Sequence, residues 1–234
     1  ARDRFEPLTV RDAYSRYLLE ARSLPDTRTV SVQQAFVGLF KEYGLPRVIH
    51  SDNGAPFASR SNVRGISKLS AWLISLGIHI HHSRPGHPQD NGGHERMHKD
   101  LKEEVQVRYM GDAKLYQAEM DTWRNEFNTI RPHEALGMKT PADMYHPSER
   151  KYKEAPAQIE YPSAFQVRKV SAYGKIKIKG NNYFITTALR KYMLGLKVVD
   201  SSQMAVYFAS VFLGKLDLET VSFTPYQNEM SFEK

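Results

Sequence analysis

The sequence predicts an α/β domain with a partly parallel sheet, followed by a small all-β barrel or sandwich. In the first part of the chain, strand-like and helix-like segments alternate, which is typical of α/β folds. Beyond a polar, proline-containing stretch, short strands follow one another without long helices between them. We therefore place the two domains at residues 1–146 and 164–224, with a linker over 147–163 and a tail over 225–234.

Local signals predict the elements of the first part. In chain order these are a strand–turn–strand unit over 7–22, a helix over 32–43, a buried strand over 47–51, a helix over 67–76, a strand over 78–82, and helices over 94–109 and 113–128. Apolar side chains recur at helical spacing in residues 32–43, with Thr29 or Ser31 as the N-cap and Gly44 at the end. Asp52 ends the buried strand, and Asn53-Gly54 supplies the turn after it.

The second part is predicted to contain short strands joined by tight turns. They lie at residues 165–170, 174–179, 183–187, 197–200, 204–208 and 211–216. Gly180-Asn181-Asn182 is predicted to be the turn of a hairpin. Because side chains alternate along a strand, Lys175, Lys177 and Lys179 are expected on one face, with Ile176 and Ile178 inward.

Composition excludes several classes of protein. The chain of 234 residues has no Cys, so it has neither disulfides nor thiolate nucleophiles nor cysteine-based metal sites. Its longest apolar runs are far shorter than the roughly 20 residues that cross a bilayer, and no signal peptide is recognisable at the N-terminus. We therefore expect a soluble, cytoplasmic protein without a membrane partner.

The distribution of charge favours an anionic partner. The chain carries a net charge of +7, and residues 161–234 contribute +5 of it, with 10 basic and 5 acidic side chains. No acidic residue occurs between Phe165 and Lys197, a stretch that includes Lys175, Lys177, Lys179 and Arg190. This pattern predicts DNA as a partner, although an ordinary solvated basic surface has the same appearance.

Two acidic residues stand where a metal site would be expected. Asp52 follows a strand, and ligands gather at the carboxyl ends of strands in α/β sheets. Glu95 lies in the first turn of a predicted helix, with Lys99 and Lys102 on the same face. Carboxylates beside cations suit Mg²⁺ and a phosphodiester. Either acid alone also fits a structural role, as a turn former or as a partner of the helix dipole.

Several segments, taken in order, resemble the integrase core of bacterial insertion-sequence transposases and retroviral integrases. The segments are Leu8–Tyr17 (LTVRDAYSRY), Gly44–Pro46 (GLP), Ser51–Phe57 (SDNGAPF), Pro85–Arg96 (PGHPQDNGGHER), Asn128 with Arg131–Leu136 (RPHEAL), and Thr140–Tyr145 (TPADMY). The resemblance covers residues 5–146. The basic, β-rich remainder resembles, in predicted shape and charge, the small Src-homology-3-like barrel that follows such cores and binds DNA.

The resemblance implies a ribonuclease-H-like fold and a triad of two Asp and one Glu that binds two Mg²⁺ or Mn²⁺ ions. These enzymes hydrolyse DNA at an element's end and transfer the freed strand to target DNA. Asp52 matches the second acid and Glu95 the third, while Lys99 and Lys102 match the helix face laid along DNA. Asn53 and the loop Gly86–Gly93 border the implied site. The resemblance further implies self-association into homo-oligomers and a bacterial cytoplasmic, nucleoid-associated location.

The resemblance also assigns Arg131 and His133 to an arginine–proline–histidine motif that contacts DNA, although a turn at the end of a helix explains the same residues. The first Asp of the triad has no match in this sequence. Asp12 belongs to the tyrosine–serine–arginine–tyrosine segment, one strand too late, and Asp3 falls in the preceding turn. Residues 1–234 are therefore expected to bind metal weakly and to transfer no strands.

Two rival functions remain open. His94-Glu95-x-x-His98 matches the zinc metalloprotease pattern, in which two His bind the metal and Glu is the base. No extended zinc-protease signature follows it, and such a site leaves Asp52 and the basic C-terminal part unexplained. The other rival is a non-catalytic remnant that binds DNA through basic side chains in the stretch 165–197, without cutting it.

Overall fold

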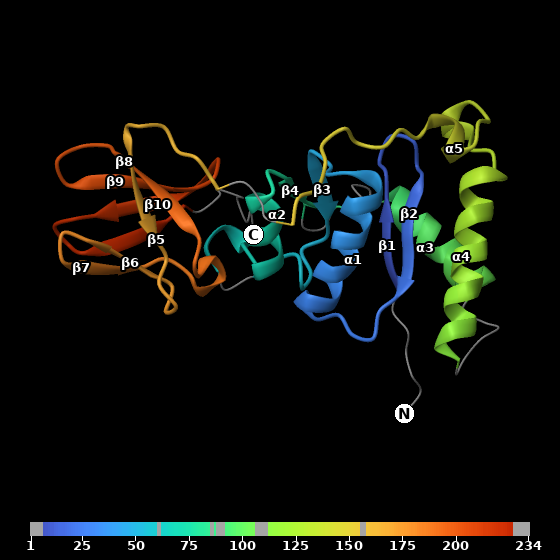
Figure 1. Ribbon diagram of the computed structural model, residues 1–234, viewed down its shortest axis with the longest axis horizontal. Helices are drawn as coiled ribbons and strands as arrows, with labels where there is room; N and C mark the ends of the chain where they lie inside the picture. The colour runs from blue at the N-terminus through green and yellow to red at the C-terminus, as the bar shows by residue number, and fades with distance from the viewer. Residues whose placement is uncertain are drawn as a thin grey trace. The chain divides into compact units, whose positions relative to one another are not determined.

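The computed structural model describes residues 7–59, 62–84, 87, 92–105, 112–154 and 158–226. The chain divides into two compact units (Figure 1). Unit 1 consists of Ala1–Pro46 and Ser83–Tyr152, and unit 2 of Arg47–His82 and Lys153–Lys234. The bounds of these units differ from those of the domains predicted at 1–146 and 164–224. The two domains themselves stay a prediction. None of the helices in the described ranges combines the length and apolar character that a membrane crossing requires.

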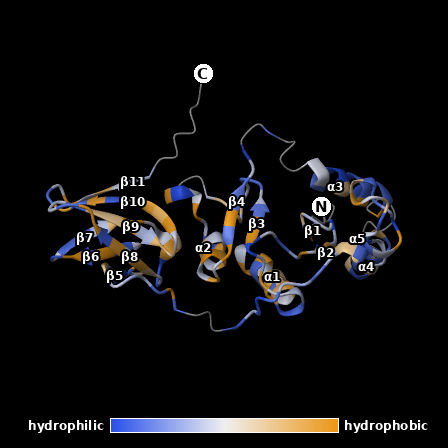
Figure 2. Cartoon of the chain, turned by 90° about the horizontal axis from the view of Figure 1, so that it is seen from above, coloured by the Kyte–Doolittle hydropathy of each residue, from blue (hydrophilic) through white to orange (hydrophobic). Residues whose placement is uncertain are grey.

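Unit 1 is built on an antiparallel strand pair covered by helices. Strands β1 (Pro7–Arg11) and β2 (Leu18–Ser23) form the predicted strand–turn–strand unit. Helix α3 (Gly92–Glu104) is largely hydrophilic (Figure 2), and it buries only Met97 and Leu101. Helix α4 (Ala113–Thr129) packs against β2. The shared core contains Leu18, Ala21, Met97, Leu101, Val105, Tyr116, Met120, Trp123 and Phe127.

Side chains of α4 satisfy backbone groups of β2 that β1 leaves free. Gln117 accepts the Ser23 N–H at 2.9 Å and donates to the Ala21 carbonyl at 3.0 Å. Arg124 donates to the Leu19 carbonyl at 3.1 Å. A strand edge with unpaired N–H and C=O groups recruits other chains, so this helix both fills the core and closes the edge.

Helix α1 (Thr29–Tyr43) starts earlier than predicted. Thr29 and Ser31 both lie inside the helix, so the expectation that either is the N-cap was wrong. Asp26 takes over part of that role, because its carboxylate accepts from the Ser31 hydroxyl at 2.7 Å and from the Arg28 N–H at 2.9 Å. Gly44 ends the helix with a φ of 80°, as predicted.

Part of the predicted linker is bound to the end of α1. The Ser148 N–H donates to the Tyr43 carbonyl at 2.8 Å, and the Leu45 N–H donates to the Arg150 carbonyl at 2.7 Å. The short helix α5 (Pro141–Met144) precedes this segment, and Thr140 caps it. The 3₁₀ helices are η1 (Val63–Gly65), η3 (Glu134–Leu136) and η4 (Thr187–Leu189).

In unit 2, strands β3 (Val48–Ser51) and β4 (His79–His82) pair in parallel, with Val48 opposite His79. The prediction of a buried strand over 47–51 was wrong in its burial, since the Val48 side chain is 53% exposed. Helix α2 (Lys68–Ser75) has a capping box between Ser67 and Ser70, which is the start that the sequence indicates. The expected core thus contributes two separate two-stranded sheets, the antiparallel pair β1–β2 in unit 1 and the parallel pair β3–β4 in unit 2, and a single mixed sheet stays a prediction.

The C-terminal part is all-β apart from η4. Its strands are β5 (Phe165–Lys169), β6 (Lys175–Ile178), β7 (Asn181–Phe184), β8 (Met193–Val198), β9 (Gln203–Phe208), β10 (Val211–Asp217) and β11 (Ser222–Pro225). Five of them form an antiparallel sheet in the order β11-β10-β9-β8-β5, and β6 and β7 form a hairpin. A Src-homology-3-like closure of these strands stays a prediction.

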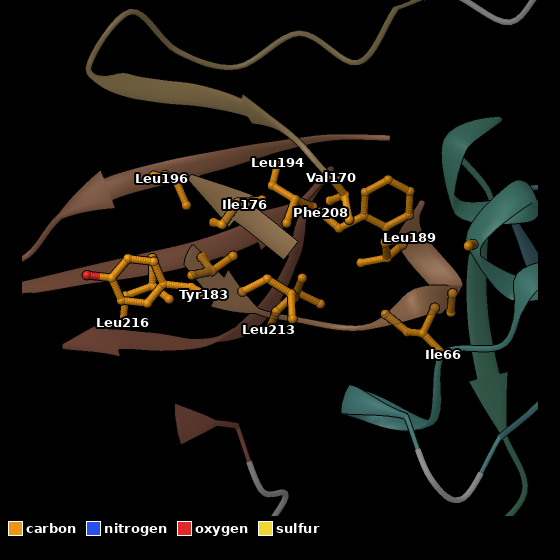
Figure 3. Close-up of a cluster of buried hydrophobic side chains, with 14 of the residues drawn as sticks. Ile66, Val170, Ile176, Tyr183, Leu189, Leu194, Leu196, Phe208, Leu213 and Leu216 are labelled. Atoms are coloured by element: carbon orange, nitrogen blue, oxygen red, sulfur yellow. The ribbon is translucent and has the colours of Figure 1, made fainter. Parts of the chain in front are cut away.

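Both sheets of this part contribute to one apolar core. Ile176 and Tyr183 from the hairpin, Leu194 from β8 and Phe208 from β9 are all buried in it (Figure 3). Ile66, which precedes α2, belongs to the same cluster. This shared core explains why residues 47–82 fall in one unit with the C-terminal strands.

The hairpin turn lies one residue earlier than predicted. Lys179 and Gly180 form it with φ values of 46° and 88°, and Asn181 and Asn182 already belong to β7. Two successive positive φ values define the type I′ turn that suits a two-residue hairpin loop. Lys179 therefore lies in the turn instead of on the strand face with Lys175 and Lys177.

Candidate functional site

Asp52 lies at the carboxyl end of β3, where the sequence predicts it. It is exposed, and its Oδ1 accepts the Gly54 N–H at 3.0 Å. The backbone carbonyl of Asp52 contacts Nδ1 of His82, which ends the neighbouring strand β4, at 3.2 Å. A Cβ at position 54 would lie only 3.1 Å from Oδ1 of Asp52. Because Gly54 has no side chain, the carboxylate has room to accept the Gly54 N–H. Asn53, also exposed, follows directly.

Glu95 lies in the first turn of α3 and is exposed. Lys99 and Lys102, one and two turns further along, are exposed as well. Lys99 has a partner of its own, because its Nζ lies 3.8 Å from Oε1 of Glu103. Most of the predicted loop Gly86–Gly93 falls outside the described residues, and its last two glycines begin α3.

The donor chemistry of Asp52 and Glu95 fits a magnesium or manganese ion. Both are exposed carboxylates, and carboxylate oxygens with water are the ligands that Mg²⁺ prefers. Asp52 belongs to unit 2 and Glu95 to unit 1. Within the described part of the chain, no three His, Asp or Glu side chains gather as a ready metal group.

His94 and His98 meet the hydroxyl of Thr9 on β1. Thr9 Oγ1 lies 3.0 Å from Nε2 of His94 and 2.7 Å from Nε2 of His98, and the two nitrogens are 3.2 Å apart. Burial, then the neighbouring His98 and Arg11, lowers the pKa of His94 to about 4. Burial and Lys102 lower the pKa of His98. Both rings are therefore neutral at pH 7, and they anchor α3 on β1.

Arg131 is held by other side chains of unit 1. Its guanidinium forms a two-pronged ion pair with Glu104, in which Nη1 donates to Oε1 at 2.9 Å. It also lies over the ring of Trp123, 5.2 Å from the centroid, and Trp123 Nε1 donates to Glu104 at 2.9 Å. Hydrogen bonding from Arg131 lowers the pKa of Glu104, and the same bond raises the pKa of Arg131.

His133 packs edge-on against Phe127, with ring centroids 4.9 Å apart. Its Nε2 is buried and has no hydrogen-bond partner within the described ranges. Burial, followed by the charges of Arg16, Arg11 and Arg131, lowers the pKa of this imidazole. Arg131 and His133 thus have clear structural roles, while the DNA contact expected of them stays a prediction.

The basic side chains of the β6–β7 hairpin point to solvent. Lys175 and Lys177 are exposed while Ile176 and Ile178 are buried, as the alternation predicts. Across the hairpin, Lys175 lies opposite Phe184 and Lys177 opposite Asn182. Arg190 is exposed beyond η4, and its Nε donates to the Thr187 carbonyl at 3.0 Å.

Sequence reasoning missed two arginines that the structure brings together. Arg11 Nη1 donates to the carbonyl of Gly93 at 2.8 Å, and Arg16 reaches the same glycine. Their only sequence signal is position, since both belong to the segment Leu8–Tyr17 that carries the family resemblance. Another residue of that segment, Tyr17, stacks on Tyr145 of the TPADMY segment at a centroid distance of 4.4 Å.

Known proteins with similar sequences are retroviral and bacterial. The Gag-Pol polyprotein of bovine immunodeficiency virus (strain R29) is 30% identical over 138 residues, which are 58% of this chain and 9% of the polyprotein. The insertion element IS476 uncharacterized 39.2 kDa protein of Xanthomonas euvesicatoria is 32% identical over 101 residues, 42% of this chain and 27% of that protein. The insertion element IS407 uncharacterized 31.7 kDa protein of Burkholderia multivorans is 25% identical over 118 residues, 50% and 40% respectively. The chain thus spans less than half of the length of each of these relatives.

Three solved structures that match part of the chain are two integrase catalytic cores and one intasome. The catalytic core domain of bovine immunodeficiency virus integrase matches with a TM-score of 0.46 and 24% identity, over 60% of this chain and 90% of that one. The catalytic core of HTLV-2 integrase in complex with magnesium, in a trimeric form, matches with a TM-score of 0.44 and 15% identity, over 61% and 93%. The simian T-cell lymphotropic virus intasome with a PP2A regulatory subunit matches with 0.48 and 14%, over 89% and 76%.

Two family models match adjoining parts of the chain, and both describe an integrase core domain. One covers residues 2–88 and the other residues 76–141. Together they span more than half of the chain and every motif from Leu8 to Pro141. They give no support to a zinc metalloprotease, and the His pair of that pattern contacts Thr9 instead of a third metal ligand. Residues 2–141 of this chain belong to the integrase core family, the DDE-type core that transposases and retroviral integrases share.

Proposed function

We propose that this chain is the core of a DDE-type transposase, a class that carries out metal-dependent phosphodiester hydrolysis and strand transfer on DNA, and that residues 1–234 alone bind metal weakly and transfer no strands because the first Asp of the triad has no match in this sequence. The integrase core match over residues 2–141 carries this proposal. It is supported by the exposed positions of Asp52 at a strand end and of Glu95 in a first helical turn.

Asp52 and Glu95 are the proposed ligands of Mg²⁺ or Mn²⁺. When bound, the ions activate a water or a 3′-hydroxyl and stabilise charge on the phosphodiester. Lys99 and Lys102 extend from Glu95 along one face of α3 and neutralise backbone phosphates. Asn53 borders Asp52 and is the proposed polar contact to the same strand of DNA.

The exposed lysines of the β6–β7 hairpin and Arg190 are the proposed accessory DNA contact. Lys175, Lys177 and Arg190 are all exposed, and no acidic residue occurs between Phe165 and Lys197 to offset their charge. The same observation favours a second candidate function, in which the chain binds DNA without cutting it. Self-association into a homo-oligomer on paired DNA ends belongs to the first proposal.

Manganese binding, followed by the electron paramagnetic resonance of free Mn²⁺, tests the acid assignments. Asp52→Asn and Glu95→Gln are each expected to weaken Mn²⁺ binding at least tenfold, since each removes one carboxylate ligand. Glu103→Gln is the matched control, because Glu103 is exposed on the same helix and its carboxylate pairs with Lys99. Unchanged affinity in both variants, with DNA binding retained, would leave the non-catalytic DNA-binding function in place.

A further inference from the structure

Two arginine side chains converge on the first turn of α3. Arg11 reaches it from the end of β1, and Arg16 from the turn between β1 and β2. A Cβ built on Gly93 would lie 3.0 Å from Arg11 Nη2, 3.0 Å from Arg16 Nη1 and 3.3 Å from Arg11 Nη1. Because both side chains lie 3.0 Å from one point, their nearest nitrogens are at most about 6 Å apart.

Neither arginine forms a salt bridge with a carboxylate among the residues that the structure describes. Arg11 donates to the Gly93 carbonyl at 2.8 Å, and Arg16 has neither a salt bridge nor a hydrogen bond within the described ranges. Asp12, whose charge acts on Arg11, accepts hydrogen bonds through its Oδ2 from the N–H and the hydroxyl of Ser15, each at 2.7 Å. Four other arginines of unit 1 do face an Asp or Glu, namely Arg22, Arg28, Arg124 and Arg131.

Positive charge outweighs negative charge around Arg11. Burial, and then the charge of Arg16, lowers the pKa of Arg11, and the charge of Asp12 offsets only part of this by raising it. The charges of both arginines help to lower the pKa of His133, whose buried Nε2 lacks a partner within the described residues. Arg16 also has a φ of 63°, a region that favours Gly or Asn over Arg. Backbone preference therefore does not account for arginine at this position.

We propose that Arg11 and Arg16 form a clamp for a DNA phosphodiester at the start of α3. The nearest nitrogens of the two guanidiniums are at most about 6 Å apart, so both can donate to the oxygens of one phosphate. Arg binds phosphate oxygens through such forked hydrogen bonds. The anion also gains from the first N–H groups of the helix, which carry its positive dipole end. This inference rests on the proposed function, because DNA is the source of the phosphate.

The clamp would hold DNA beside one of the proposed metal ligands. Glu95 lies two residues after Gly93, within the same first turn of α3. A phosphate fixed at Gly93 therefore places the DNA strand within about one helical turn, roughly 5.4 Å, of the Glu95 backbone. Gly93 is needed for this, because any Cβ there would press on both guanidiniums.

The salt dependence of binding to a fluorescein-labelled DNA duplex, measured by anisotropy on the full chain, tests the clamp. Arg11→Gln and Arg16→Gln are each expected to weaken binding about tenfold and to lower the slope of log affinity against log salt by about 0.9. Arg16→Lys keeps the charge but loses the fork, so it should weaken binding while the slope stays near that of the wild type. Arg28→Gln is the control, since it removes one charge from an exposed arginine paired with Asp26.

Gly93→Ala provides a variant that keeps every charge. Its methyl group meets only the ends of two flexible side chains, so the fold is expected to survive while the clamp is displaced and duplex affinity falls. Thermal unfolding in sodium phosphate against sodium chloride, at equal ionic strength, separates the sources of phosphate. A rise in Tm that is lost in Arg16→Gln, without any change in DNA binding, would assign the pair to free phosphate and overturn the DNA clamp.

The two proposals fail in different ways. If the wild-type chain shows no salt-dependent affinity for duplex DNA, the proposed function fails. If it binds DNA but Arg11→Gln, Arg16→Gln and Gly93→Ala all retain the wild-type slope and affinity, only the clamp is refuted.

Discussion

The side-chain amide of Asn128 pairs with both backbone groups of Leu18. Its Oδ1 accepts the Leu18 N–H at 2.8 Å, and its Nδ2 donates to the Leu18 carbonyl at 3.0 Å. Asn128 is buried near the end of α4, and Leu18 is fully buried at the start of β2. A buried backbone group without a partner is costly, so this single amide fixes the end of α4 to the sheet edge.

Asn128→Leu should therefore destabilise the chain strongly. The change leaves the buried N–H and C=O of Leu18 unpaired, at a cost of about 1–3 kcal/mol for each unsatisfied group. Asn125→Leu, at an exposed position of the same helix, should change the free energy of unfolding by less than about 0.5 kcal/mol. Urea denaturation of both variants measures the difference, and equal stabilities would show that water replaces the amide.

The His94–His98–Thr9 cluster predicts a loss of stability on mild acidification. The pKa of His94 is lowered to about 4 in the folded chain, whereas an unfolded His titrates near 6.5. Between these values the unfolded chain binds more protons, so the free energy of unfolding falls as the pH falls. The expected loss from pH 7 to pH 5 is about 2 kcal/mol for His94.

Urea titrations at pH 7, 6 and 5 check this sign and size. His94→Gln removes the titrating ring but keeps a side chain that can hydrogen-bond to Thr9, so its stability should depend less on pH than that of the wild type. His79→Gln is the control, since His79 is exposed on β4. If His94→Gln reproduces the wild-type profile, the pKa of His94 does not differ between the folded and the unfolded chain, and this prediction is wrong.

Elements with strong local signals were predictable from the sequence. Ser67 and Gly77 bracket α2 because a capping hydroxyl and a residue with positive φ act within one helical turn. The end of β3 at Asp52 and the alternation along β6 were confirmed for the same reason. Local competition explains the errors, since Asp26 displaces Thr29 as the group that organises the start of α1.

Relationships between distant residues were beyond such reasoning. Thr9 meets His94 across 85 positions, and no periodic pattern links a strand hydroxyl to a helix imidazole at that separation. Arg11 and Arg16 look like ordinary solvated charges in the sequence, and only the fold shows that both reach Gly93 and that neither has a salt bridge among the described residues. Strand β11 was missed because four residues ending in Pro225 give no alternation to detect.

Two glycines should respond to alanine with opposite signs. Gly195 on β8 lies against the ring of Tyr161, and a Cβ added at Gly195 would lie 2.8 Å from the ring of Phe165. The Tyr161 hydroxyl donates to the Met193 carbonyl at 2.9 Å, which holds the ring in place. Gly195→Ala is thus expected to cost about 1–3 kcal/mol through overpacking. Gly38, exposed within α1, has nothing within 4 Å of an added Cβ, so Gly38→Ala should stabilise by about 0.5–1 kcal/mol. Thermal unfolding of both variants distinguishes these outcomes, and a stabilised Gly195→Ala would show that Tyr161 is readily displaced.

Lys177 decides whether the hairpin face binds DNA. Its side chain is exposed opposite Asn182, and neither strand of the hairpin carries an acidic residue. If this face neutralises phosphates, Lys177→Glu should weaken duplex binding and lower the slope of log affinity against log salt by about 1 or more. Lys215→Glu, at an exposed position on β10, applies the same change of charge outside the hairpin and should alter the slope less. Equal slopes for the two variants would mean that net charge alone attracts DNA, because a defined contact has to lose more when its own lysine is reversed.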